Sequence, residues 1–139
     1  MIVVPDEGKK WLLDALLRTE PGDILPFYVR LFKNDADLDR YAVRADFEEA
    51  NFDGYLPVEL VRADWSPSVM NGIRAQTVYG TSFLTWVADS GTQDIYGYIV
   101  TDNDDNFVLW GDKFVPPIEV SDVVPVSFSP VMRLRDEEV

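Results

Sequence analysis

Three apolar runs between residues 83 and 114 constrain the fold of this chain more than any other stretch. They read FLTWV, IYGYIV and FVLW, and the two segments between them are rich in Gly, Asp, Asn and Ser. Extended apolar runs with short polar breaks are typical of consecutive antiparallel strands joined by tight turns. The stretch therefore predicts a β-meander of three adjacent strands.

Both faces of these predicted strands are apolar. In the first run, Phe83 and Val87 fall on the side opposite Leu84 and Trp86, because alternate side chains leave a strand on opposite sides. A sheet that is apolar on both sides must be covered on both, which favours a sandwich or a sheet capped by a helix. Gly97, in the middle of the second run, predicts a bulge, a bend or a large neighbour lying across it.

Residues 5–18 form the one segment with clear helical periodicity. Pro5 and the acidic residues that follow it suit a first helical turn. An apolar stripe at helical spacing runs through Trp11, Leu12, Ala15 and Leu16. The polar side has no strong basic excess, so we expect this helix to cover an open side of the β core rather than to bind a membrane.

Extended segments are also predicted on both sides of the three runs. Residues 26–33 and 57–63 have strand character, and residues 124–135 alternate apolar and polar side chains. Two prolines in the last segment cannot donate to a sheet ladder, so we expect this strand to lie at an edge or to carry a bulge. Residues 65–72 and 114–122 hold further turn formers and are predicted as loops.

Together these segments predict a single domain over residues 1–139. A chain of 139 residues buries roughly two thirds of the surface that it exposes when unfolded. We expect a mainly β fold, an antiparallel, jelly-roll-like β-sandwich of about residues 26–135, with one N-terminal amphipathic α-helix of about residues 5–18 packed on it.

The composition excludes several classes of site. The chain has no cysteine and no histidine, so disulfides, zinc sites built on those residues, Ser-His-Asp triads and Cys-His dyads are ruled out. Its 25 acidic and 12 basic residues give a net charge of −13, which argues against binding to nucleic acid or to an anionic membrane. We expect no cofactor, no metal, and a chain made soluble without a signal peptide or a membrane span.

Two acidic segments have some of the spacing of a cation loop. The first places carboxylates at every second position, at Asp35, Asp37 and Asp39. We favour a solvated turn there, because calcium loops usually bring a Gly and a distal acidic ligand. The second, TDNDDN at residues 101–106, has Phe107 where a calcium loop requires Gly and Lys113 where it requires Glu, so it predicts a hairpin turn.

Signals of catalysis are weak. Glu48 and Glu49 are adjacent, and adjacent residues of a regular element point apart, so they do not form the facing pair of a glycosidase. The run GTSFL lacks the second Gly of a nucleophile elbow, and no His exists to activate Ser82. We expect a protein that is not an enzyme.

Several phrases of the chain carry a family resemblance. They are MIVVPDEGKKWLLDALL, a strand ending LFKND, ADFEEANFDGYLPVEL, QDIYGYIVTD and LWGDKF. Their order resembles that of a group of small proteins encoded among the virion genes of tailed bacteriophages. In that group a VP-x-x-G helix precedes an Asn-Asp turn, a DF-x-EA-x-F-x-GY phrase follows, and Tyr-Gly-Tyr precedes a Thr-Asp turn and a Leu-Trp strand.

The resemblance implies a structural virion protein. The expected role is capsid decoration, that is, a cement protein bound to the outer surface of the phage head after synthesis in the host cytoplasm. Its expected partners are the major capsid protein and copies of itself, since such proteins are commonly symmetric oligomers. The residues expected to contact a partner are Trp11, Asp35, Tyr41, Arg133 and Arg135.

An alternative role is a receptor- or carbohydrate-binding module of a tail fibre or baseplate. It is favoured by aromatic residues near polar loops, such as Trp65 beside Ser66 and Ser68. Packing inside the core or across strands is the simpler expectation for most of these aromatic residues, namely Tyr55, Trp65, Tyr79, Tyr96, Tyr98 and Trp110.

Overall fold

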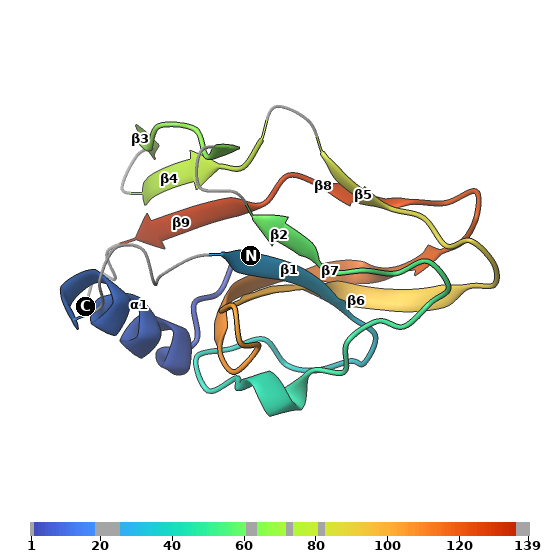
Figure 1. Ribbon diagram of the computed structural model, residues 1–139, viewed down its shortest axis with the longest axis horizontal. Coiled ribbons are helices and arrows are strands. Elements are labelled where there is room, and N and C mark those ends of the chain that lie inside the picture. The colour runs from blue at the N-terminus through green and yellow to red at the C-terminus, as the bar shows by residue number, and fades with distance from the viewer. Residues whose placement is uncertain (1, 19–25, 61–63, 72–73, 81–82, 136–139) are drawn as a thin grey trace.

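The computed structural model describes residues 2–18, 26–60, 64–71, 74–80 and 83–135 (Figure 1). Within these residues the protein is mainly β, with antiparallel sheets and one α-helix near the N-terminus. This arrangement is consistent with a β-sandwich and confirms the predicted fold class.

The helix α1 spans Asp6–Arg18, as its periodicity predicts. It packs closely against the large sheet, because a Cβ on Gly8 would lie 2.5 Å from the carbonyl oxygen of Leu109. Trp11 meets the ring of Phe27 edge-on, with the two ring centroids 5.5 Å apart. The helix therefore covers part of the β core, which confirms its predicted position.

The large sheet has the strand order β2-β1-β6-β7. Its strands are β1 at Phe27–Phe32, β2 at Val58–Leu60, β6 at Gln93–Thr101 and β7 at Val108–Val120. All neighbours are antiparallel, and β1 and β6 pair from Tyr28 opposite Thr101 to Phe32 opposite Gly97. The central strands are the most buried part of the chain, as expected of strands covered on both faces.

The second group of strands forms two smaller sheets. One has the order β3-β4-β9, with β3 at Val69–Asn71, β4 at Arg74–Val78 and β9 at Val131–Arg135. The other pairs β5 at Leu84–Trp86 with β8 at Val126–Phe128. Because β8 and β9 are consecutive along the chain and are separated only by two residues, the two small sheets continue one another (Figure 1).

Aromatic side chains join the two layers. The ring of Phe128 on β8 stacks on Tyr98 of β6 at 4.3 Å and on Trp86 of β5 at 5.3 Å. Trp86 and Tyr98 are buried, and they belong to one apolar cluster that spans both layers. Burial of such rings supplies much of the apolar area that stabilises a domain of this size.

The predicted β-meander is only half correct. β6 and β7 do form an antiparallel hairpin, but β5 pairs with β8 and lies in the other layer. The indole N–H of Trp86 donates to the carbonyl of Leu56 at 2.9 Å, and the Ala88 N–H donates to the carbonyl of Ser121. β5 therefore lies beside β8, and the connection after it crosses from the smaller layer to the large sheet.

Two predicted loops also contain strands. Residues 65–72 include β3, an edge strand that pairs with β4, and residues 114–122 include the end of β7. β7 accommodates its Pro-Pro pair because it lies at the edge of its sheet, where a missing N–H costs no ladder bond. The expected edge position of the last segment is confirmed, since β8 and β9 each lie at the edge of their sheets. The single strand predicted there is instead divided in two, because β8 ends and β9 begins around Pro130.

Gly97 confirms its predicted role. The register of β6 against β7 shifts between Ile95 and Gly97, and a Cβ on Gly97 would lie 2.7 Å from the ring of Phe32. A bulge and a large neighbouring side chain therefore coincide at this position.

Candidate functional site

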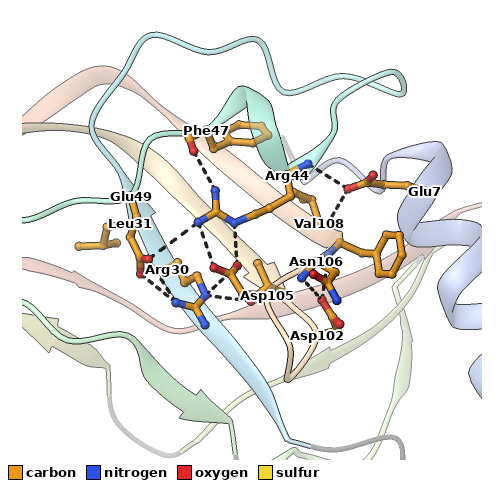
Figure 2. Close-up of polar contacts among 12 residues, drawn as sticks. Glu7, Arg30, Leu31, Arg44, Phe47, Glu49, Asp102, Asp105, Asn106 and Val108 are labelled. Carbon is orange, nitrogen blue, oxygen red and sulfur yellow. Dashed lines mark hydrogen bonds and ion pairs between the residues drawn. The ribbon is translucent and has the colours of Figure 1, made fainter.

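A compact group of charged side chains lies at one end of the large sheet. Figure 2 shows Arg30 of β1, Arg44, Glu49 and Asp105 gathered there. Arg44 belongs to a short 3₁₀ helix at Arg44–Asp46, and Asp105 lies in the turn between β6 and β7. We refer to these four residues as the charge cluster.

Each arginine of the charge cluster contacts both carboxylates. Arg30 donates from Nη1 to the two oxygens of Glu49 at 3.2 and 3.1 Å, and its Nε lies 3.2 Å from Oδ1 of Asp105. Arg44 donates from Nε to Oδ1 of Asp105 at 2.6 Å, and its Nη2 lies 3.8 Å from Glu49. The four side chains are 13 to 31% exposed, so two positive and two negative charges balance in a largely buried setting.

The backbone of the β6–β7 turn places the Asp105 side chain in the charge cluster. Asp105 has φ 57°, a left-handed conformation that residues other than Gly adopt at a cost. The buried carboxylate of Asp102 accepts the backbone N–H groups of Asn106 and Phe107 at 2.8 and 2.9 Å. The turn is therefore held from both ends, by Asp102 within it and by the arginines outside it.

Tyr55 connects the cluster to the sheet. Its hydroxyl donates to Oε2 of Glu49 at 2.7 Å and accepts the backbone N–H of Leu31 at 3.1 Å. Burial raises the pKa of the Tyr55 phenol above its ordinary value, and the hydrogen bond to Glu49 raises that pKa further. The phenol stays protonated and positions Glu49.

Glu7 ties the helix to the same region. Its Oε1 accepts the backbone N–H of Arg44 at 3.1 Å and that of Val108 at 2.8 Å. Because one carboxylate oxygen receives both amides, Glu7 holds the backbone at Arg44 beside the backbone at Val108. Asp6 donates its backbone N–H to the carbonyl of Arg40 at 2.8 Å, which fixes the preceding loop to the start of α1.

The chemistry of the charge cluster is that of a structural support. Both carboxylates are engaged by arginines, and Glu49 also accepts the Tyr55 hydroxyl. Among the described residues, no three acidic side chains are placed so that they could hold a metal ion. What the arrangement can do is hold the 44–49 segment, β1, the helix and the β6–β7 turn in fixed relative positions.

The structure separates the five residues predicted to contact a partner. Trp11 is half-buried against Phe27, so its ring is used mainly for packing. Asp35 and Tyr41 lie on the loop after β1, where Asp35 forms an ion pair with Lys113. Arg133 and Arg135 lie on β9 in the other layer. The prediction that they contact a partner therefore concerns at least two surfaces.

Exposed apolar side chains lie on the two segments that Glu7 and the charge cluster hold. We call Tyr41, Val43 and Phe107 the apolar patch; they are 73, 41 and 40% exposed. The Arg40 guanidinium lies over the Tyr41 ring, 5.1 Å from its centroid. Sequence analysis named Tyr41 as a partner contact but not Val43 or Phe107, because the Glu7 carboxylate brings together segments that are far apart in the sequence.

The acidic segments behave as turns where they are described. Asp39 accepts the Tyr41 N–H at 2.9 Å, as expected of an Asp that stabilises a turn. Residues 101–106 form the predicted turn between β6 and β7. Glu48 is exposed whereas Glu49 is bound in the charge cluster, so the two adjacent acids do point apart. Ser82 lies outside the described residues.

Aromatic packing is confirmed for the residues named from the sequence. Tyr79, Tyr98 and Trp110 are buried, and the other three are half-buried. Trp65 lies 5.2 Å from Tyr79 and 6.0 Å from Trp110, measured between ring centroids. Its ring is therefore partly used within the core, which weakens the feature that favoured a carbohydrate-binding module.

Comparison of the chain with protein-family models, curated proteins and solved structures finds no match. In the described part of the chain, no helix has both the length and the apolar character needed to cross a membrane.

Proposed function

We propose that this chain is a non-enzymatic structural protein of a tailed-phage virion, a decoration protein that binds the outer surface of the head and stabilises it. The observation that carries the proposal is that the sequence phrases resembling the phage group supply contacts inside the fold. Internal contacts are made by Glu49 and Tyr55 of the ADFEEANFDGY phrase and by Gly97 of the QDIYGYIVTD phrase. They build a rigid support, and the support presents the apolar patch.

The apolar patch is the surface that we assign to the capsid. Its three residues come from the loop after β1 and from the β6–β7 turn, and Glu7, Asp102 and the charge cluster hold both segments. A pre-organised apolar surface binds with a smaller loss of conformational entropy than a flexible one. Exposed aromatic side chains of this kind are typical of the centre of an interface.

Rebinding to stripped phage heads tests the proposal. Heads of the encoding phage, freed of this protein, are mixed with the purified chain, and the bound fraction is measured by co-sedimentation. We expect binding at many copies per head and a higher temperature of DNA release from the decorated heads. Equal heat resistance with and without the protein would contradict the proposal, and a few copies per particle would favour the tail module.

A matched pair of variants tests the assigned surface. Tyr41→Ala removes the most exposed ring of the apolar patch, and we expect head affinity to fall by at least about tenfold, as for an interface anchor. Val115→Ala alters another exposed side chain, 87% accessible and outside the patch, and we expect it to leave affinity unchanged. Equal affinities for the two variants would assign the capsid contact elsewhere.

A further inference from the structure

The acidic residues of this chain avoid one of its two layers. We call the strands β3, β4, β5, β8 and β9 the smaller layer; they lie within residues 65–88 and 123–135. These two stretches contain no Asp or Glu, although 25 of the 139 residues of the chain are acidic. The negative charge of the chain is therefore carried entirely by the other residues.

The absence of acids extends to side chains that face solvent. Phe128 on β8 packs against the large sheet, so Ser127 beside it points away from the core. Thr85 lies directly opposite Ser127 on β5, and the two hydroxyl oxygens are 3.0 Å apart. On either side of Thr85, Phe83 and Val87 are 68 and 43% exposed. Outward positions of a solvated sheet usually carry polar or charged side chains, whereas these carry hydroxyl and apolar groups.

Further exposed apolar side chains lie on the other edge strand of the smaller layer. Val69 and Met70 on β3 are 56 and 69% exposed. Single exposed apolar side chains are ordinary on a protein surface, but several of them on strands without an acid are typical of a surface that another protein covers.

We propose that the chain forms a two-fold dimer in which the outer faces of two smaller layers meet. Two copies that each carry a net charge of −13 repel each other, and this repulsion is weakest where neither copy presents an acid. A two-fold contact uses the same surface on both copies, so that surface must be complementary to itself. Apolar side chains meet this condition, and so do hydroxyls, because each can both donate and accept a hydrogen bond.

A second copy fits this face better than a polyanion does. Among the described side chains of the five strands, the charged one is Arg133, and its Nε donates to the side-chain oxygen of Gln76 at 3.3 Å. A phosphate or carboxylate surface would lose hydration there and would also meet the acids of the rest of the chain.

The proposed dimer leaves the opposite side of the molecule available. Figure 1 shows the smaller layer and the short 3₁₀ helix at Arg44–Asp46 on opposite sides of the large sheet. The inference concerns the purified chain alone and does not rest on the proposed virion role.

Sedimentation velocity over a range of protein concentrations tests the inference. The wild-type chain should form dimers and no larger species, because a two-fold contact closes on itself. Dimerisation should strengthen between about 0.05 M and about 0.5 M salt, since salt screens the repulsion between the two acidic copies. F83E/V87E places acids on the outer face, and its self-affinity should fall by at least about tenfold.

Two further measurements separate this contact from general effects of charge and folding. L13E/V115E adds the same charge at two exposed apolar positions, on α1 and β7, and it should dimerise like the wild-type chain. An equimolar mixture of F83E/V87E with F83K/V87K should associate more tightly than either variant alone, which also shows that both are folded. A wild-type chain that is monomeric at both salt concentrations, dimers that weaken with added salt, or an equal loss in L13E/V115E would overturn the proposal.

Discussion

The two layers of this protein use their arginines in opposite ways. In the large sheet, Arg30 and Arg44 each contact two carboxylates within the largely buried charge cluster. In the smaller β3-β4-β9 sheet, Arg133 is exposed and donates to the neutral side-chain amide of Gln76. The first arrangement joins four segments of the fold, whereas the second joins two neighbouring strands.

Solvent explains why both arrangements exist in one molecule. A charge removed from water loses hydration free energy, so largely buried arginines require balancing carboxylates and hydrogen bonds. Exposed charges keep their hydration and are screened by salt, so an exposed arginine needs no balancing carboxylate. The comparison indicates that the charge cluster supplies stability, whereas Arg133 contributes little to it.

Truncating one arginine in each layer should give the largest contrast. Arg44→Ala removes the hydrogen bonds to Asp105 and to the Phe47 carbonyl and leaves two carboxylates to share Arg30. We expect the free energy of unfolding to fall by about 2–4 kcal/mol. Arg133→Ala removes an exposed side chain and should change it by less than about 0.5 kcal/mol. Urea unfolding curves of the two variants measure the difference.

The slopes of the same urea unfolding curves provide a control. Both variants should unfold with the wild-type dependence on urea concentration, because neither changes the surface exposed on unfolding by much. If Arg133→Ala were as destabilising as Arg44→Ala, Arg133 would be part of the structural support, and the contrast between the layers would be lost.

Short-range features of the sequence predicted the local structure well. The helix could be predicted because its apolar stripe and acidic first turn lie within a few residues of each other. The β6–β7 hairpin could be predicted because its turn residues lie between two apolar runs. The prediction that β5 pairs with β6 was wrong. Strand pairing in a sandwich depends on contacts such as that of Trp86 with Phe128, which produce no periodic pattern in the sequence.

The charge cluster could not be predicted for the same reason. Its members are separated by up to 75 positions along the chain, from Arg30 to Asp105, and they come from a strand, a short helix, an irregular segment and a turn. Arg30 occupies an ordinary outward position of an alternating strand, and Asp105 is one of several acids in its turn. The only local signal was an isolated arginine in an otherwise apolar strand, which favours a buried ion pair without naming its partner.

The buried phenol that supports the cluster should make the large sheet sensitive to alkali. The pKa of Tyr55 is raised in the folded chain above 10.0, its ordinary value. As pH rises past 10, the unfolded chain loses this proton while the folded chain keeps it. The free energy of unfolding should therefore fall by roughly 1.4 kcal/mol for each pH unit above 10, and buried Tyr98 acts with the same sign.

Tyr55→Phe separates the two contributions of this phenol. At pH 7 it removes the hydrogen bonds to Glu49 and to the Leu31 amide, and we expect a loss of about 1–2 kcal/mol. Above pH 10 the variant should lose stability less steeply than the wild-type chain. Urea unfolding at a series of pH values measures both effects, and an unchanged slope above pH 10 would show that Tyr55 does not keep its proton in the folded chain.

The smallest effect concerns two exposed acidic residues, Asp94 and Glu119, which lie directly opposite each other on β6 and β7. Asp94→Lys and Glu119→Lys each replace a repulsion across β6 and β7 with an attraction, so each should stabilise the chain by about 0.2–1 kcal/mol. The double variant restores a like-charged pair and should return close to wild-type stability, a non-additivity that a double-mutant cycle of unfolding free energies measures. Added salt should shrink both gains. Additive effects in the cycle would mean that the two carboxylates do not interact across the strands.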